Sequence, residues 1–297
     1  MNERIVDISE EGASISAQGG LFVIQKKEKE TVSIPFSQIG VVILGHPMIR
    51  ITGTALSRIV MNKGIVIVCE NYLPVAMLLP IGTHSTVSRN YALQAMAKTV
   101  LKKNLWAEIV RKKVKFQSDL LDRLGRPNPL KRMIDLVRSG DTTNVEGHAA
   151  RLYWEALFGD NFVRNRERED ANRFLNYGYI VLRSCVARAL CSSGLHPSFG
   201  IYHHNQYNAY CLVDDMMEPF RPLVDEVVFH LIRRVDPEEE FSSDIKKELI
   251  SVLKRRVVID ERSYELFDAL SLVSSSLLLS YERGKMFLRL PEKIFEE

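Results

Sequence analysis

The pattern of apolar and polar positions changes once along the chain, near residue 80. Before that point, short runs rich in β-branched residues are separated by glycine, proline and asparagine, which is typical of strands joined by turns. Alternation in T-V-S-I-P-F and the apolar runs V-V-I-L and I-V-I-V favour one sheet packed on another. A single helix is expected at residues 52–64, with Thr52 as its N-cap and Gly64 at its end. The expected strands cover residues 4–8, 13–16, 21–25, 30–34, 39–44, 64–69 and 76–79.

After residue 87 the apolar positions recur every three to five residues, which is the spacing of amphipathic helices. A polar connector containing Pro80 and Gly82 predicts a linker at residues 81–87. The sequence therefore predicts an α+β multidomain protein, with a small N-terminal β-sandwich-like domain at 1–80 and an all-α C-terminal domain at 88–297. The expected helices run through residues 93–114, 116–124, 129–138, 145–158, 168–192, 212–232, 243–256 and 262–283.

Charge is distributed unevenly along this chain of 297 residues, although its formal net charge is only +3. Residues 87–140 contain thirteen Lys or Arg against four Asp or Glu, whereas residues 214–297 contain thirteen against nineteen. Such a basic block predicts contact with a polyanion such as nucleic acid, with a solvated helix face as the alternative. The residues of this block that we expect to contact phosphates are Lys102, Lys103, Arg111 and Lys112.

The four cysteines show no C-x-x-C pairing, so buried thiols in a reducing compartment are expected rather than disulfides or a zinc site. The first residues lack the charged-then-apolar order of a secretion signal, and no apolar run reaches the 18–20 residues, roughly, of a membrane span. These observations predict a cytoplasmic protein that does not enter a membrane.

The segment at residues 194–225 carries the strongest candidate chemistry. Asp215 and Glu218 are three residues apart and would share one face of a helix. His203, in a preceding loop, could join them around one divalent cation, because histidine and carboxylates suit an ion that activates oxygen at phosphorus. Glu146 is the best candidate for a further acid from elsewhere in the chain.

Each of these residues also has a simpler interpretation. Glu146 would lie in the first turn of a helix capped by Thr143 or Asn144, where the helix dipole favours any acid. A histidine in a loop is more often a surface or core residue than a ligand, although the flanking turns favour His203 as the inward member of the pair with His204. Arg221 could orient a carboxylate or clamp a phosphate, or simply pair with an acid one turn later.

Arg164 and Arg166 belong to a cluster of mixed sign, R-N-R-E-R-E-D. A salt-bridged helix start is one interpretation of that cluster, and contact with a DNA backbone is the other. The candidate nucleic-acid contacts near the site are therefore Arg164, Arg166, His204 and Arg221.

Three motifs together resemble the CRISPR-associated adaptation integrase family, the spacer-acquisition nuclease, in the branch found with type II systems. They are N-V-E-G at 144–147, G-L-x-P-x-x-G-I-x-H at 194–203 and D-D-M-M-E-P-F-R-P at 214–222. The resemblance implies that Glu146, His203 and Glu218 bind Mn²⁺ or Mg²⁺. Some branches also use the acid three residues earlier, here Asp215, which we rank below the other three.

The resemblance also implies an activity. The 3′-hydroxyl of a captured DNA fragment attacks a phosphodiester of the CRISPR repeat, and with water as nucleophile the same site acts as a metal-dependent endonuclease. The substrates would be double-stranded DNA with single-stranded 3′ ends and CRISPR repeat DNA. Members of the family form a homodimer through the strand domain, and two dimers flank a small dimeric CRISPR-associated adaptation partner protein.

Two other functions remain open at the level of sequence. The chain could be a DNA-binding scaffold with a weak site, which the complete set of costly clustered acids argues against. It could also be a general metal-dependent nuclease acting on RNA or branched DNA.

Overall fold

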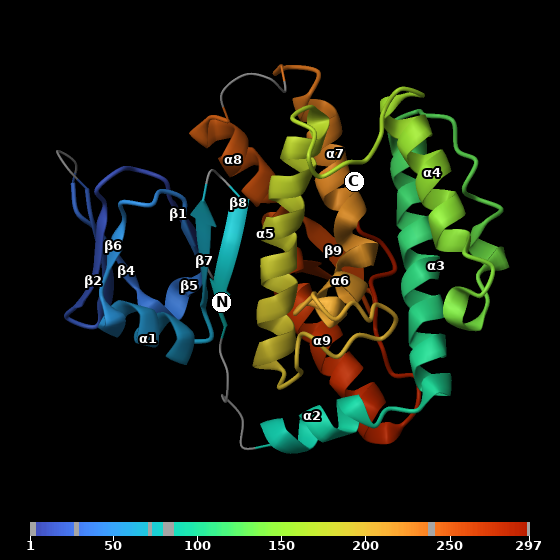
Figure 1. Ribbon diagram of the computed structural model, residues 1–297, viewed down its shortest axis with the longest axis horizontal. Coiled ribbons are helices and arrows are strands. Elements are labelled where there is room, and N and C mark those ends of the chain that lie inside the picture. The colour runs from blue at the N-terminus through green and yellow to red at the C-terminus, as the bar shows by residue number, and fades with distance from the viewer. Residues whose placement is uncertain (1–3, 27–29, 71–72, 80–85, 237–240, 296–297) are drawn as a thin grey trace. The chain divides into compact units, whose positions relative to one another are not determined.

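The computed structural model describes residues 4–26, 30–70, 73–79, 86–236 and 241–295 (Figure 1). The chain forms two compact units, residues 1–87 and 88–297. The linker expected at 81–87 falls mainly on residues 80–85, which lie outside the described residues. The domain boundaries expected from the sequence therefore stay a prediction.

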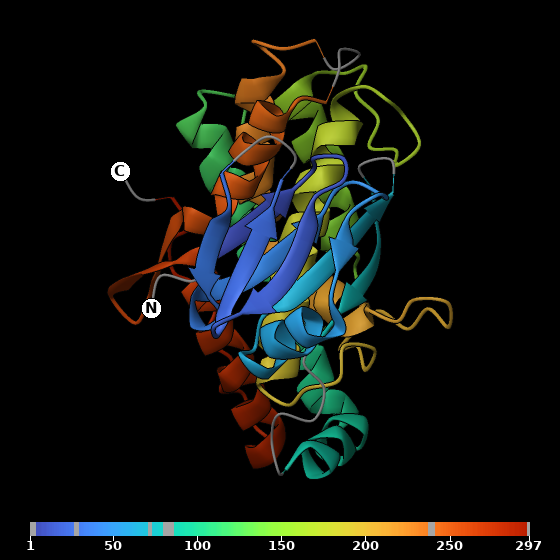
Figure 2. The same ribbon diagram turned by 90° about the vertical axis from the view of Figure 1, so that its left-hand side faces the viewer.

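The first unit consists of two four-stranded sheets (Figure 2). One sheet has the order β1-β5-β7-β8, with β1, β5 and β7 parallel and β8 antiparallel at the edge. The other has the order β4-β3-β2-β6. The strands are β1 (Arg4–Ile8), β2 (Ser14–Gln18), β3 (Leu21–Gln25), β4 (Val32–Pro35), β5 (Ile39–Leu44), β6 (Arg50–Ile51), β7 (Ile65–Glu70) and β8 (Leu73–Leu78).

The apolar faces of both sheets meet in one core, to which helix α1 (Gly53–Met61) also contributes. Phe22 of β3 packs edge-on against Phe36, and Ile59 of α1 is fully buried. The Thr52 hydroxyl accepts a hydrogen bond from the Ala55 amide at 3.3 Å, so the predicted N-cap is confirmed. The expected strands were also found, whereas the two-residue β6 was too short to predict.

The second unit is largely helical, as predicted. Helix α3 is central: it buries side chains on most of its circumference and packs against α4 and α7. Helix α5 packs against α6, α7 and α9. The helices are α2 (Val87–Ala95), α3 (Thr99–Arg123), α4 (Val145–Phe158), α5 (Ala171–Ser192), α6 (Cys211–Met217), α7 (Arg221–Leu231), α8 (Ser243–Ile250) and α9 (Leu266–Arg283).

This unit also contains a β-hairpin, so "all-α" was too narrow a description. Strands β9 (Arg256–Ile259) and β10 (Arg262–Glu265) pair antiparallel around a two-residue turn. Asp260 and Glu261 both adopt positive φ, of 50° and 61°. That conformation matches the twist of a hairpin, and the β-branched run before it suits a strand.

Several predicted helix boundaries were wrong. The helix expected at 129–138 is instead a series of turns with a 3-10 turn at Ile134–Leu136. Residues 116–124 continue α3 rather than forming a separate helix. The helix expected at 212–232 is interrupted by a 3-10 turn at Glu218–Phe220.

Among the helices that the structure describes, none is both long and apolar enough to cross a membrane.

Candidate active site

Glu146 lies in the first turn of α4, and the preceding loop fixes its position. The carboxylate of Asp141 accepts hydrogen bonds from the amides of Val145 at 2.9 Å and Glu146 at 3.0 Å. Asn144 caps the helix through the Gly147 amide, and a Cβ at position 147 would lie 2.8 Å from the Asn144 side chain. The glycine of the N-V-E-G motif therefore allows the cap that positions Glu146.

His203 is held by Asp215, which is fully buried on α6. The Asp215 carboxylate accepts hydrogen bonds from the amides of Ile201 at 2.6 Å, Tyr202 at 3.0 Å and His203 at 3.2 Å. It also lies 2.6 Å from Nδ1 of His203, so Nδ1 carries the proton and donates it. The opposite ring nitrogen, Nε2, is thereby left as an acceptor or metal ligand. The hydrogen bond to Asp215 raises the pKa of His203.

The loop that carries His203 depends on Gly200. A Cβ at position 200 would lie 2.2 Å from the His203 carbonyl oxygen and 3.0 Å from Cβ of Cys211. Any other residue would displace the loop, which explains the second glycine of the G-L-x-P-x-x-G-I-x-H motif. Trp106 of α3 supports the same loop, because it stacks on Tyr202 at 4.4 Å between ring centroids and meets the His203 ring edge-on at 5.7 Å.

Glu218 lies in the 3-10 turn between α6 and α7, where Pro219 ends the first helix. Its Oε1 atom accepts a hydrogen bond from Nε of Arg221 at 2.9 Å. Of the roles considered for Arg221, the structure therefore shows the pairing with a carboxylate, and the partner is Glu218, three residues earlier. Burial by itself would raise the pKa of Glu218, but Arg221 and Lys113 outweigh it and lower the pKa to about 2. Glu218 is thus a buried, permanently charged carboxylate.

Lys113 of α3 bridges the two glutamates. Its Nζ atom lies 2.6 Å from Oε1 of Glu146 and 2.5 Å from Oε2 of Glu218, and the residue is only 7% exposed. Burial favours the neutral amine, but Glu218 and Glu146 overcome that effect and raise the pKa of Lys113. One ammonium therefore lies between two of the three expected metal ligands.

The positions of Glu146, His203 and Glu218 decide whether they suit a divalent cation. Within the described part of the chain, no three His, Cys, Asp or Glu side chains already surround one point at metal-binding distance. Glu146 and Glu218 nevertheless share the Lys113 ammonium. Both glutamates are also near enough to His203 to raise its pKa. Oε2 of Glu218 is buried and accepts no well-aligned hydrogen bond from any residue that the structure describes, despite the short ion pair with Lys113. Two carboxylates and one imidazole with a free nitrogen are a donor set that fits Mn²⁺ or Mg²⁺.

A cavity of about 240 Å³ lies beside Glu218 and is unusually rich in cationic side chains. Arg164 is fixed there by the side-chain oxygens of Asn172 and Asn176, both at 2.8 Å. The residues lining the cavity are Lys113, Gln117, Ala150, Trp154, Arg164, Arg166, Tyr179, Glu218, Arg221 and Asp225.

Asp225 lies at the base of this cavity and is fully buried. The Tyr153 hydroxyl donates to it at 2.7 Å, and the Tyr179 hydroxyl also donates to it. Burial raises the pKa of Asp225 to about 6, against the opposing effect of the two tyrosine hydrogen bonds. Arg221 packs over the Tyr179 ring at 4.6 Å, which links this cluster to Glu218.

The basic block does not form one uniform surface. Arg111 is tied to Glu108 at 3.2 Å and to the Val137 carbonyl at 3.0 Å, and Lys112 packs over the Phe116 ring. Lys103 is exposed and Lys102 is half-buried. His204 and Arg166 are also exposed, on the segments that carry His203 and Arg164.

Sequence reasoning did not identify Lys113 as part of the site. The apolar stripe of α3 runs through Leu105 and Ile109 to Leu120, and Lys113 and Gln117 interrupt it. Polar residues at buried helical positions are rare unless they have partners, so this interruption could have drawn attention to both. Asp215, which was ranked as an optional ligand, has both oxygens occupied by the loop of His203.

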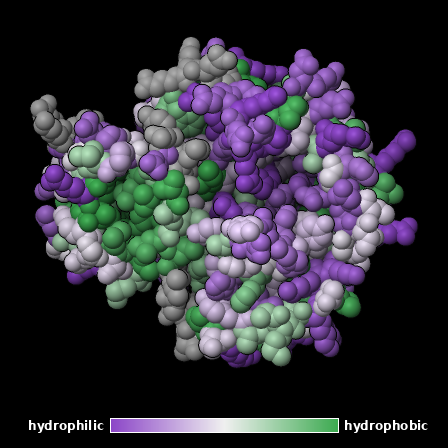
Figure 3. Space-filling model, viewed as in Figure 1, coloured by the Kyte–Doolittle hydropathy of each residue, from purple (hydrophilic) through white to green (hydrophobic). Residues whose placement is uncertain are grey.

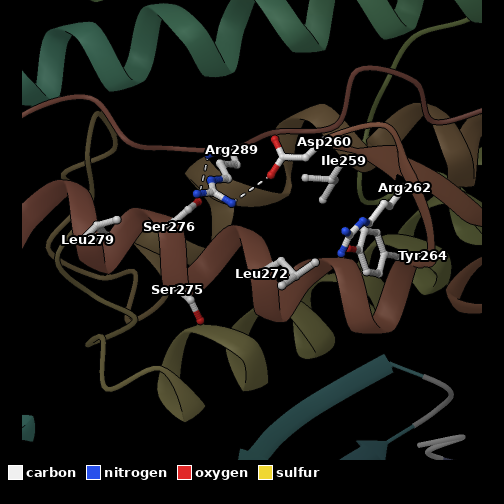
Figure 4. Close-up of a pocket in the computed structure, with 9 residues that line it drawn as sticks. All are labelled: Ile259, Asp260, Arg262, Tyr264, Leu272, Ser275, Ser276, Leu279 and Arg289. Atoms are coloured by element: carbon white, nitrogen blue, oxygen red, sulfur yellow. Dashed lines mark hydrogen bonds and ion pairs between the residues drawn. The ribbon is translucent and has the colours of Figure 1, made fainter.

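A larger cavity, of about 500 Å³, lies between the β9–β10 hairpin and α9 (Figure 4). Arg289 on its wall pairs with Asp260 at 2.9 Å. None of the expected site residues lines it, so it is not the candidate active site.

Residues 6–262 of the chain match the family described as CRISPR associated protein Cas1. A CRISPR-associated endonuclease Cas1 from Neisseria meningitidis serogroup C (strain 8013) is 35% identical over 286 residues, which is 95% of this chain and 93% of that protein. This chain belongs to the Cas1 family. The predicted family is thus confirmed, and similarity to the Neisseria protein agrees with the type II branch.

Solved structures show the Cas1 fold independently. A casposase bound to integration product has a TM-score of 0.78 at 19% identity, covering 99% of this chain and 94% of its own. A Cas1 protein from Thermotoga maritima has a TM-score of 0.73 at 14% identity, covering 99% of this chain and 100% of its own. As a member of the Cas1 family, the chain is a CRISPR-associated endonuclease of spacer acquisition.

Proposed function

We propose that Glu146, His203 and Glu218 hold one Mn²⁺ or Mg²⁺ ion, with which the chain joins captured DNA fragments to a CRISPR repeat. One observation carries this proposal: the half-buried Glu146 of α4 and the buried Glu218 of the turn before α7 meet at the Lys113 ammonium, and both lie near enough to raise the pKa of His203, whose Nε2 is left available by Asp215. A bound divalent cation would polarise the scissile phosphodiester and stabilise charge on its oxygens.

The remaining residues prepare the site for that ion. Asp215 selects the histidine tautomer and fixes its ring, which is the usual task of a carboxylate behind a metal-binding histidine. Its full set of hydrogen bonds favours this positioning role over direct metal contact. Arg221 holds one oxygen of Glu218 and so leaves the other directed at Lys113 and the proposed ion.

The substrate of this site is DNA, in our proposal, and the cavity beside Glu218 receives its backbone. Arg164, Arg166 and Arg221 would neutralise phosphates there, and Lys102, Lys103, Lys112 and His204 would extend the contact, which reads charge rather than sequence. Arg111 contributes less, because its guanidinium is held by Glu108 and the Val137 carbonyl and it is not among the residues that line the cavity. One solved neighbour, a TtCas1-DNA complex with a TM-score of 0.58, supports this proposal at the level of fold.

We also propose that the chain works as a homodimer with a small dimeric adaptation partner protein, in the cytoplasm. Apolar side chains gather on the face of the first unit seen in Figure 3. On the same unit, Val68 of β7 and Val75 and Leu78 of the edge strand β8 are 39%, 60% and 40% exposed. Apolar, exposed edge strands are suited to pairing with another copy. A structure titled Cas6-RT-Cas1–Cas2 complex matches with a TM-score of 0.74 at 18% identity, covering 100% of this chain and 36% of its own.

A joining assay tests the function directly. The protein is incubated with a labelled DNA fragment bearing free 3′-hydroxyls and a supercoiled plasmid bearing the repeat, with Mn²⁺ or with a chelator. We expect joined products with Mn²⁺ and none with chelator, and we expect His203→Ala to abolish joining while DNA affinity changes by no more than a few fold.

His230→Ala is the matched control, because His230 is an exposed histidine at the end of α7 and faces none of these residues. Joining by His203→Ala at the wild-type rate would refute the proposed site. Cleavage without joining would identify a general nuclease, and binding alone would identify a scaffold.

A further inference from the structure

We infer that Lys113 is the internal counter-ion of the metal site: its ammonium holds Glu146 and Glu218 together before a divalent cation binds, and the cation must displace it. This inference rests on the proposed function, because it takes the two glutamates as metal ligands. It adds to the site a residue, Lys113, that sets the affinity for the divalent ion and keeps the two glutamates in position before the ion binds.

The Lys113 ammonium lies between two glutamates that come from different parts of the chain. Glu146 comes from α4 and Glu218 from the turn before α7, and Lys113 of α3 contacts both at 2.6 and 2.5 Å. Two carboxylates brought together without a cation would repel each other and would have to be desolvated. Lys113 removes that cost, so the metal-free site keeps its two acids in place.

The Lys113 ammonium and a divalent ion would compete for the same carboxylate oxygens. The Glu218 carboxylate already has one oxygen on Arg221, and its other oxygen is the one that faces Lys113. A divalent ion bound between Glu146 and Glu218 would stand next to a buried positive charge at the same oxygens. Because like charges at such distances are strongly unfavourable where water is excluded, both cations cannot occupy the position together.

Gln117 offers an acceptor to the displaced ammonium. Gln117 lies one helical turn after Lys113 on α3, and residues four apart share a helix face. Its Oε1 atom is buried and accepts no hydrogen bond from any described residue. Both side chains line the same 240 Å³ cavity, so Lys113 has both room to move and an acceptor at its destination.

The consequence is a coupling between ion and substrate. Moving the ammonium toward Gln117 places it in the cavity that also holds Arg164, Arg166 and Arg221. There it adds a positive charge for a DNA phosphate, and only once the ion has been bound.

Calorimetric titration of the full-length, DNA-free protein with Mn²⁺ tests this inference. We expect Lys113→Met to bind Mn²⁺ at least about tenfold more tightly than wild type, because no ammonium has to be displaced. Lys113→Arg keeps the charge and should bind more weakly than Lys113→Met. Lys115→Met is the control, because Lys115 lies on the same helix but pairs with Asp119 and touches neither glutamate; its affinity should equal that of wild type.

A double-mutant cycle tests the destination. Gln117→Leu should weaken Mn²⁺ binding several-fold when Lys113 is present, and should have no effect on Mn²⁺ binding in the Lys113→Met background. Equal effects in the two backgrounds would refute the role of Gln117. If Lys113→Met does not fold, the other two variants still test the displacement. Gln117→Leu should then bind Mn²⁺ more weakly than wild type, and Lys113→Arg should bind it no more tightly than wild type; the opposite results would refute the displacement.

His203→Ala separates this inference from the proposed function. If His203→Ala binds Mn²⁺ as tightly as wild type, the proposed metal site itself is wrong. If His203→Ala weakens binding but Lys113→Met binds no more tightly than wild type, the metal site stands and Lys113 is only a structural partner of the glutamates.

Discussion

Nδ1 of His203 lies 2.6 Å from Oδ1 of Asp215, and the same carboxylate accepts three successive backbone amides of the loop that carries the histidine. Asp215, a single buried acid, therefore fixes the conformation of the loop, the orientation of the His203 ring and the tautomer of that ring. The i, i+3 spacing of Asp215 and Glu218 thus gives one acid to the histidine and the other to the proposed ion.

Asp215→Asn should reduce joining by about tenfold or more, the usual effect of removing a carboxylate behind a metal-binding histidine. The pKa of His203 should fall, because the hydrogen bond to Asp215 is the main cause of its increase. NMR titration of the His203 ring measures that fall alongside the joining rate. Asp214→Asn is the control, since Asp214 pairs with Arg183 instead. An unchanged His203 pKa in Asp215→Asn would contradict this account.

Gly200→Ala should disable the site without unfolding the protein. The added Cβ would lie 2.2 Å from the His203 carbonyl oxygen, so the loop must shift and carry the ring away from Glu146 and Glu218. We expect joining to fall at least tenfold, with destabilisation of about 1–3 kcal/mol in thermal or urea unfolding. Gly53→Ala is the control, because no atom of the described residues lies within 4 Å of a Cβ there. Wild-type joining by Gly200→Ala would show that the loop can accommodate the added Cβ without moving His203.

The sequence predicted the strands of the first unit well because their β-branched runs are short and bounded by turn residues. Apolar periodicity alone could not locate the end of α6, where Pro219 sits in a 3-10 turn that keeps Glu218 buried. It also could not distinguish β10 from the start of α9, because four residues are too few to establish a period.

The candidate site was only partly predictable for a different reason. Motif spacing identified Glu146, His203 and Glu218, but which charged groups share a buried carboxylate depends on packing between helices distant in sequence. Lys113 precedes Glu218 by more than a hundred residues and lies in a block whose net charge predicted contact with a polyanion, with a solvated helix face as the alternative. Its burial between two carboxylates, which the sequence does not show, distinguishes it from the other lysines of the block.

Asp225 should make stability fall as the pH rises from about 4 to 7. Its pKa is raised to about 6 in the folded protein from an ordinary value of 3.8, so the folded state binds more protons than the unfolded state in this interval. Stability from this group is therefore greatest below pH 4 and is lost as the pH passes through 6, by about 3 kcal/mol in all.

Urea unfolding of wild type and Asp225→Asn at several pH values measures this effect. Asn keeps a side-chain oxygen for Tyr153 or Tyr179 but carries no charge. The free energy of unfolding of Asp225→Asn relative to wild type should therefore increase from pH 4 to pH 7. A difference that is constant over this interval would mean that Asp225 is ionised throughout.

Lys102 and Lys103 of α3, half-buried and exposed respectively, should contribute to the salt dependence of DNA binding. Replacing Lys102 and Lys103 by Gln should reduce the slope of log K against log salt by up to about 2, since each phosphate contact contributes about 0.9. Fluorescence anisotropy over a range of KCl concentrations measures the slope. Lys247→Gln, an exposed lysine of α8 that pairs with Asp244, should leave the slope unchanged; an unchanged slope in the double variant would mean that these lysines form only a solvated helix face.

Val75→Glu should convert the proposed homodimer to monomer. Val75 is 60% exposed on β8, the edge strand of its sheet, and its neighbours Val68 and Leu78 are exposed as well. A carboxylate buried there against a second copy would have to be desolvated without a partner, which costs far more than an apolar contact returns. Light scattering after size-exclusion chromatography gives the mass.

Val32→Glu on β4 is the matched control, because Val32 is 43% exposed but lies in the other sheet. If both variants remain dimeric, the copies meet through a surface other than the β7–β8 edge, since an unpaired carboxylate buried in an apolar interface would disrupt it.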